Sequence, residues 1–174
     1  MSDRIRIAQM RDYPAVFRFY RETCEALPGA EYGPAWIWGV YPSEDMLREH
    51  MESGELFVKT RDGELVAALI LLDHEDPEYV SVPWEIRSPS PVCAIHLFAV
   101  HPAFRGKMLG EECLRELFAV CRQKRMAAVH LDVVKGNLPA EKLYQKMGFQ
   151  FVCDREIYYP DAGDLLVSLY EYLL

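Results

Sequence analysis

Long apolar runs are missing from this 174-residue sequence. No stretch approaches the ~18 consecutive apolar residues that a membrane-spanning helix needs. The first twelve residues, MSDRIRIAQMRD, also contain no apolar segment of the kind found in a secretory signal. We therefore expect no membrane association and a cytoplasmic location.

Paired cysteine motifs are missing as well. The cysteines number five, an odd count, and no two of them have C-x-x-C spacing. This pattern argues against both a disulfide framework and a zinc site, and it suits a reducing compartment. We expect no bound metal.

An excess of positive charge is the third absence. The chain has 19 Lys and Arg residues against 27 Asp and Glu residues, a formal net charge of -8. Sequence-independent nucleic-acid binding depends on Lys and Arg side chains that neutralise phosphates, so we expect no nucleic-acid partner. The length and the 51% hydrophobic content are typical of one globular domain, which we expect over residues 1–174.

Hydrophobic periodicity predicts the element order β-α-α-β-β-β-α-β-α-β-β. This order indicates an α/β fold with a mixed, mostly antiparallel sheet and helices on both faces. Alternating charged and apolar residues predict the first strand over 4–9. Asp12 and Ser43 are the expected N-caps of the first two helices, and Asp62-Gly63 predicts a tight hairpin turn. The strands expected at 93–100 and 128–134 flank a helix and should form a central parallel pair.

The stretch HPAFRGKMLG, residues 101–110, lies between an apolar strand and an amphipathic helix. Helical spacing predicts an apolar face on that helix, made of Leu109, Cys113, Leu114, Leu117, Phe118 and Cys121. A helix that begins near Lys107 has unpartnered backbone N–H groups at its positive end, where an anion can bind. Arg105 adds charge, and Gly106 and Gly110 allow close backbone approach. A basic connector without a ligand explains the stretch equally well. A nucleotide P-loop is excluded, because Gly-Lys opens the motif and no Ser or Thr follows it.

A second stretch, GNLPAEKLYQKMGF, predicts a short helix with Asn137 as its N-cap and Gly148 at its end. Helical spacing places Tyr144 on the inward face. Its hydroxyl then either bonds to a backbone carbonyl in the core or points into a pocket, because a buried hydroxyl without a partner is costly.

Together the two stretches resemble a known superfamily. The pattern V-H-P-x-x-R-G-K-x-L-G at Val100–Gly110 is followed, 27 residues after Gly110, by N-x-x-A-x-x-L-Y-x-x-x-G-F. These motifs and the element order are similar to those of the GNAT superfamily of acyl-CoA-dependent N-acetyltransferases. Features such as AIHLFAVHP and LDVVKGN resemble a poorly characterised bacterial branch of small cytosolic acetyltransferases.

The resemblance implies acetyl-CoA as co-substrate and a backbone cradle for its pyrophosphate. Met108 departs from the family pattern, because glycine is commonest at that position. No glycine is needed there if the backbone is right-handed helix. The resemblance also implies a bulge in the preceding strand, whose amides would pair with the pantetheine arm. The residues implied in cofactor binding are Phe98, Ala99, Val100, Arg105, Gly106, Lys107, Met108, Leu109, Gly110, Asn137, Ala140 and Lys142.

The resemblance further implies transfer of an acetyl group to the primary amine of a small molecule by direct attack. Tyr144 matches the residue that protonates the leaving thiolate. Three residues are candidates for the base: His96, which shares strand parity with Phe98, Asp132 and Glu85. The alternative is a non-catalytic acyl-CoA-binding or regulatory module with the same fold.

The acceptor pocket is expected in two loops rich in aromatic residues. The residues expected to bind the acceptor are Trp36, Tyr41, Trp84 and Glu85. Large aromatic residues such as these, and Trp38 beside them, are also frequent in cores. The identity of the acceptor is left open, as is the choice between a monomer and a homodimer.

Overall fold

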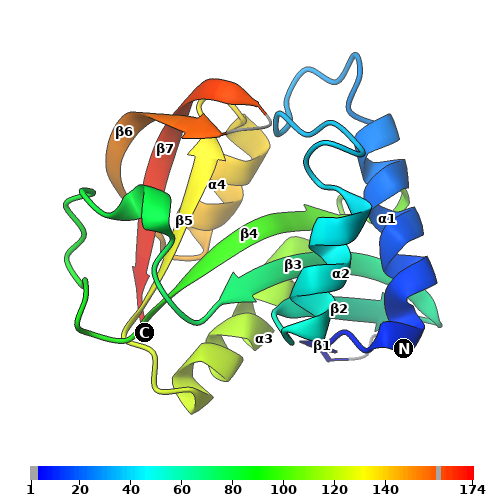
Figure 1. The fold of residues 1–174 in the computed structure, drawn as a ribbon, viewed down its shortest axis with the longest axis horizontal. Helices are drawn as coiled ribbons and strands as arrows, with labels where there is room; N and C mark the ends of the chain where they lie inside the picture. The colour runs from blue at the N-terminus through cyan, green and yellow to red at the C-terminus, as the bar shows by residue number, and fades with distance from the viewer. Residues whose placement is uncertain (1–3, 160–161) are drawn as a thin grey trace. The chain divides into compact units, whose positions relative to one another are not determined.

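The computed structural model describes residues 4–159 and 162–174. Within these residues the order of helices and strands is the predicted one, with three short 3-10 turns in addition (Figure 1). The helices are α1 (Tyr13–Glu25), α2 (Glu44–Glu52), α3 (Leu109–Gln123) and α4 (Leu138–Lys146). The strands are β1 (Arg6–Ile7), β2 (Leu56–Arg61), β3 (Glu64–Leu72), β4 (Val92–Val100), β5 (Ala128–Val134), β6 (Gln150–Tyr159) and β7 (Gly163–Leu173).

The described strands hydrogen-bond in the order β1-β2-β3-β4-β5-β7-β6. The β4–β5 pair is parallel, whereas the β1–β2, β2–β3, β5–β7 and β6–β7 pairs are antiparallel. This topology confirms the predicted mixed α/β sheet with a central parallel pair. By its contacts the described chain groups into two compact units, whereas one domain over 1–174 stays a prediction. The first unit holds residues 4–30, 36–71 and 96–116, and the second holds 31–35, 72–95, 117–159 and 162–174.

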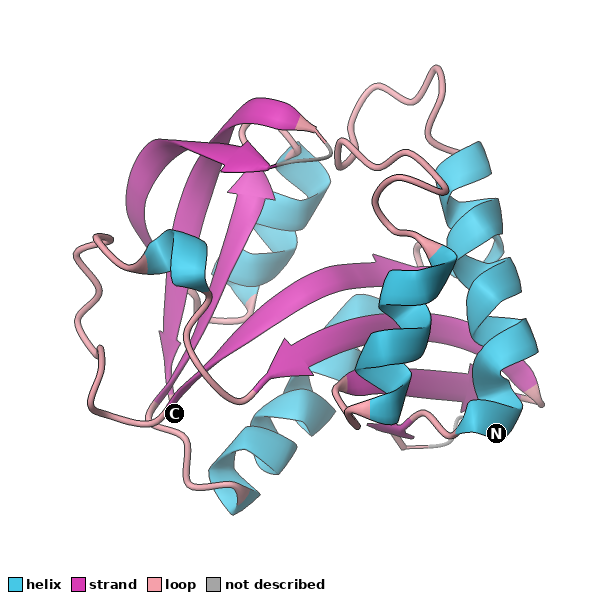
Figure 2. Cartoon of the chain, viewed as in Figure 1, coloured by secondary structure: helices cyan, strands magenta, loops and turns pink. Residues whose placement is uncertain are grey.

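The first unit contains the hairpin of β2 and β3, with α1 and α2 side by side across it (Figure 2). Asp62 and Gly63 have φ values of 52° and 84°, the left-handed pair that a tight I′ turn requires, so this predicted turn is confirmed. The predicted cap of α2 is also confirmed, because Ser43 Oγ accepts from the backbone N–H of Met46 at 3.3 Å.

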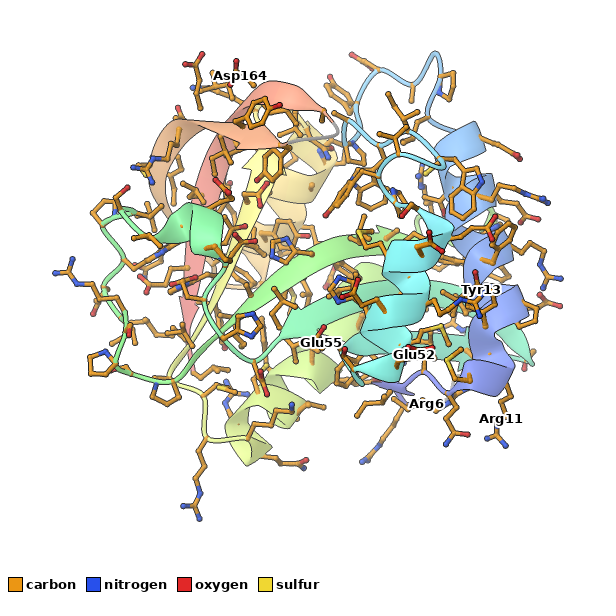
Figure 3. All side chains as sticks on the ribbon, viewed as in Figure 1. Arg6, Arg11, Tyr13, Glu52, Glu55 and Asp164 are labelled. Atoms are coloured by element: carbon orange, nitrogen blue, oxygen red, sulfur yellow. The ribbon has the colours of Figure 1, made fainter. Side chains whose placement is uncertain are left out.

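The start of the chain differs from the prediction. The expected strand over 4–9 is reduced to Arg6–Ile7, and the Asp12 side chain does not cap α1. Instead the Asp12 carboxylate accepts from the guanidinium of Arg6 at 2.7 Å and from the backbone N–H of Gln9 at 2.8 Å (Arg6 is labelled in Figure 3). The hydrogen bond from Arg6, together with the Arg6 charge, lowers the pKa of Asp12. The Asp12 carboxylate thus closes the turn before the helix.

A buried cation joins β2 to α3 inside the first unit. Lys59 has a side chain that is only 2% exposed, and its Nζ lies 2.8 Å from Glu116 Oε1. Glu116 also accepts from the backbone N–H of Ile5 at 2.7 Å. One carboxylate thus fixes α3 against two segments of the same unit.

The second unit is built on β5, β7 and β6. The first half of β4 runs parallel to β5, with Val92 opposite Ala128 and Ala94 opposite His130. On α3 the predicted apolar face is confirmed, since every one of its members is buried: Leu109, Cys113, Leu114, Leu117, Phe118 and Cys121. Phe118 stacks on Tyr172 of β7 with ring centroids 4.0 Å apart.

Candidate functional site

A left-handed residue interrupts β4 just before the segment implied to bind the pantetheine arm. Leu97 has a φ of 50°, is buried, and its carbonyl accepts from the hydroxyl of Tyr20 on α1 at 2.9 Å. Such a residue breaks the alternation of a strand, as a β-bulge does. Leu97 lies between His96 and Phe98, and the parity argument that paired these two residues stays a prediction. Phe98, like Ala99 and Val100, is half-buried.

The chain after β4 is anchored at His101. Its backbone N–H donates to Val66 of β3 at 2.9 Å, and its Nε2 lies 2.9 Å from a carboxylate oxygen of Glu22 on α1. A 3-10 turn, Pro102–Phe104, follows. The entry to the candidate anion-binding turn is thereby fixed to two elements of the first unit.

The turn itself carries a run of free amides. Gly106 and Met108 have φ values of 77° and 55°, and α3 begins at Leu109 rather than near Lys107. Among the described residues, no acceptor takes the backbone N–H groups of Gly106 through Gly110. Amides in a left-handed turn that opens a helix form a concavity suited to an anion. The exposed side chains of Arg105 and Lys107 add positive charge.

Met108 does not meet the condition under which glycine would be dispensable. Its φ of 55° is left-handed, not right-handed helical, and its side chain is 66% exposed. Left-handed backbone is unfavourable for residues with a Cβ, and glycine adopts it freely. The family preference for glycine at this position thus has a backbone cause that the sequence argument did not foresee.

Tyr144 on α4 is buried, as predicted, with its ring 5.4 Å from that of Phe149. Burial raises the pKa of Tyr144 well above its usual value, and the charge of Asp132 on β5 adds to this. The two predicted catalytic residues of the second unit are therefore within electrostatic reach of each other. Asn137 stands at the N-cap as predicted, but its side chain makes no capping hydrogen bond. Its carbonyl instead accepts from two amides of α4 at 3.1 Å.

The remaining cofactor residues of α4 differ in exposure. Ala140 is half-buried and Lys142 is exposed.

Asp132 has a partner that the sequence did not reveal. The hydroxyl of Tyr79, from the 3-10 turn Pro77–Tyr79, donates to Oδ1 of Asp132. Tyr79 is 1% exposed, and burial raises its pKa far above the usual value, with the Asp132 charge as the next cause. The two residues are 53 positions apart, so no local pattern could have signalled the pair.

His130, two residues before Asp132 on β5, was also missed. It is fully buried, with Nδ1 2.8 Å from Glu75 and Nε2 3.0 Å from Glu171 of β7. The ring of Trp84 stacks on it, with centroids 3.9 Å apart and planes 8° apart. Trp84 is thus packed in the core of the second unit, which matches the structural reading of that residue.

The other acceptor candidates are less enclosed. The side chain of Glu85 is exposed, while its backbone N–H donates to Glu171 at 3.0 Å. Trp36 and Tyr41, in the first unit, are half-buried, and the ring of Trp36 lies 6.4 Å from that of Tyr20. Trp38 is half-buried and packs edge-on against Phe17 at 4.9 Å. Their roles in acceptor binding stay predictions.

Two kinds of feature do not occur in the part of the chain that the structure describes. No group of three or more His, Cys, Asp or Glu side chains is arranged to hold a metal ion. Over the same residues, no helix combines the length and apolar character needed to cross a bilayer.

Comparison with known proteins gives three kinds of similarity: to curated relatives, to solved structures and to a family model. N-alpha-acetyltransferase RimI of Mycobacterium tuberculosis is 36% identical over 77 residues, which are 44% of this chain and 47% of RimI. The matched stretches span less than half the length of each of the curated relatives.

Solved structures match over nearly the whole chain. A GNAT-family acetyltransferase of Streptococcus agalactiae has a TM-score of 0.76 at 16% identity, with 99% of this chain and 95% of that chain covered. The ribosomal-protein-S18-alanine N-acetyltransferase of Escherichia coli has a TM-score of 0.68 at 21% identity, with 99% and 94% covered. At such identities these matches show a shared fold.

The family model supplies the remaining evidence. The model described as the acetyltransferase (GNAT) family matches residues 14–149, which include the 105–110 turn, Asp132 and Tyr144. The match covers well over half of the sequence, and the observed sheet agrees with it. The chain belongs to the acetyltransferase (GNAT) family.

Proposed function

We propose that this chain is an acetyl-CoA-dependent N-acetyltransferase that moves an acetyl group to a primary amine by direct attack. The observation that carries the proposal is the run of five amides, Gly106 to Gly110, that find no acceptor among the described residues. They occur at the family's pyrophosphate motif, beside the exposed cationic side chains of Arg105 and Lys107. Acetyl-CoA supplies the activated acyl thioester.

Binding of the pyrophosphate rests on main-chain donors and on the charges of Arg105 and Lys107. Hydrogen bonds to an ionised acceptor are about twice as strong as neutral ones. With Gly106 and Met108 in left-handed conformation, the N–H groups of the turn lie outside the hydrogen-bonding pattern of α3. The site therefore needs no nucleotide P-loop and no metal ligand set.

Among the candidate bases we favour Asp132 over His96 and Glu85. A primary amine is mostly ammonium at neutral pH, and it must lose a proton before it can attack. A half-buried carboxylate that is held by Tyr79 can attract the ammonium and then take its proton, directly or through one water. Glu85 is exposed, and His96 is followed directly by the left-handed Leu97.

Tyr144 is proposed as a hydrogen-bond donor to the departing sulfur. Its raised pKa means that the phenol keeps its proton throughout the physiological range. A thiol has an ordinary pKa of about 8.5, so full proton transfer from a buried phenol to a thiolate is unfavourable. Tyr144 thus lowers the energy of the leaving group by donation, and solvent completes the protonation.

We propose a small-molecule primary amine as the acceptor. A second candidate, the N-terminal amine of a protein, is favoured by one observation: the similar Escherichia coli enzyme is named for the alanine of ribosomal protein S18. Both candidates present the same reacting group, and a panel of amines and N-terminal peptides distinguishes them.

The first experiment is thermal unfolding with acetyl-CoA and with CoA. At a hundred times its dissociation constant a ligand adds about 2.7 kcal/mol, which is about 5–11 °C for a chain of this size. Arg105→Ala/Lys107→Ala should reduce that shift, whereas Arg11→Ala/Lys124→Ala, which removes as much charge elsewhere, should not. No shift with either ligand at millimolar concentration would refute the proposal.

The second experiment measures thiol release from acetyl-CoA across the amine and peptide panel. Turnover with any member supports an enzyme. Binding of acetyl-CoA without turnover on any member would favour the alternative, an acyl-CoA-binding module.

A further inference from the structure

The segment from Glu75 to Ile86 is fixed to the face of β5 and to β7 at several points. Glu75 and Trp84 both contact His130, one through a carboxylate and one through a stacked ring. Near the other end, the backbone N–H groups of Glu85 and Ile86 donate to the two carboxylate oxygens of Glu171, at 3.0 and 2.9 Å. Tyr79 lies within the segment that these contacts hold.

Tyr79 is held inside this frame by its ring and by its hydroxyl. Its ring packs edge-on against Trp84, with centroids 5.6 Å apart, and its hydroxyl is buried. A buried hydroxyl needs a partner, and Oδ1 of Asp132 provides it. Because the pKa of Tyr79 is raised by burial, the hydroxyl keeps its proton and remains a donor at any physiological pH.

The same hydrogen bond fixes the orientation of the Asp132 carboxylate. The terminal torsion of an aspartate is broad and nearly two-fold, so a free carboxylate exchanges its oxygens. Here Oδ1 is committed to Tyr79, and among the described residues no side chain donates to Oδ2. One oxygen is anchored and the other is left for an external donor.

We propose that Tyr79 is a positioning residue, which orients the carboxylate of Asp132 so that Oδ2 receives the acceptor amine. This role rests on the proposed function and on Asp132 as its base. Tyr79 touches neither the amine nor acetyl-CoA and acts only through Asp132. The anchored segment supplies the rigidity, since its attachment to β5 and β7 does not pass through Asp132.

Tyr79→Phe tests the role, because it removes the hydroxyl and keeps the ring that packs against Trp84. A reacting group that is poorly oriented loses rate, so kcat should fall about 10- to 100-fold. The KM for acetyl-CoA should stay within about 2-fold, since no cofactor contact is changed. In an Asp132→Asn background the same substitution should change kcat by less than about 2-fold, because there is no base left to orient.

The matched control is Tyr172→Phe. The hydroxyl of Tyr172 accepts from the guanidinium of Arg122 at 3.1 Å, and its ring stacks on Phe118. This variant also loses a bond to a charged side chain and keeps the ring packing without touching Asp132, so its kcat and KM should equal those of the parent.

A spectroscopic measurement tests the bond itself without turnover. The buried Tyr79 hydroxyl proton should give a downfield proton resonance in the NMR spectrum, absent from both Tyr79→Phe and Asp132→Ala, which removes the accepting oxygen, and present in Tyr172→Phe. A resonance that survives unshifted in Asp132→Ala would overturn the pairing.

The kinetic outcomes separate the two proposals. A parent enzyme that turns over, with a folded Tyr79→Phe variant of equal kcat, would overturn the role of Tyr79 alone. A parent that turns over no amine would overturn the proposed function and this role with it, even if the resonance is found.

Discussion

Met108→Gly should stabilise the protein. Met108 has a φ of 55° and an exposed side chain, so the substitution relieves left-handed strain with little loss of packing. The left-handed conformation costs a residue with a Cβ about 1–2 kcal/mol. Glycine itself destabilises the folded state by about 0.5–1 kcal/mol, because it gives the unfolded chain more conformational freedom. A net gain of about 0.5–1 kcal/mol follows, or about 1–4 °C in Tm for a chain of this length.

Met108→Ala is the decisive control, because alanine removes the long side chain and keeps the Cβ. If backbone strain is the cause, Met108→Ala gains no stability and Met108→Gly does. Thermal unfolding of both variants, alone and with saturating CoA, measures the difference. Equal stabilisation by alanine and glycine would refute the backbone argument and would place the cost in the methionine side chain.

Two further predictions concern buried ionisable groups. Lys59→Ala removes the buried cation that pairs with Glu116 and should lower the free energy of unfolding by about 3 kcal/mol. This is the low end of the range for buried ion pairs, because the Glu116 side chain is 29% exposed. A loss below about 1 kcal/mol in urea unfolding would show that solvent replaces the pair. Burial raises the pKa values of Tyr20, Tyr79 and Tyr144 above those in the unfolded chain. The stability that these buried, protonated phenols contribute is therefore fully present below pH 10 and is lost as the pH rises above 10. Each should remove about 1.4 kcal/mol of stability per pH unit above 10, and a urea midpoint that stays level between pH 10 and 11 would contradict this.

Most of the fold could be predicted from the sequence, because its signals are local. Asp62-Gly63 is a pair that readily adopts the left-handed conformations of a tight turn. The Ser43 hydroxyl can accept from an amide in the first turn of α2, and the apolar spacing of α3 identifies its buried face. Strand β5 was expected at the bounds it has, 128–134. The length of the first strand was overestimated. Charged and apolar residues alternate over 4–9, but only Arg6 and Ile7 pair with β2.

The candidate site could be predicted only in part, for two physical reasons. Leu97 and Met108 adopt a left-handed backbone conformation. Leucine and methionine do not favour this conformation, so the residue types gave no signal for it, and the surrounding contacts impose it. Tyr79 bonds to Asp132, 53 residues away, and His130 bonds to Glu171, 41 residues away. Such distant contacts leave no local pattern in the sequence. Tyr144 was found because helical spacing alone places it inward.

The attachment of the Glu75–Ile86 segment has a consequence for how its sequence can change. Glu171 holds that segment by the main-chain N–H groups of residues 85 and 86, so any residue but proline can stand at either position without losing the anchor. Mutational scanning at 85 and 86 should therefore return a broad set of folded variants, whereas substitution of Glu171 should return few. Residues 85 and 86 are accordingly positions where an engineer can introduce new side chains next to a fixed frame.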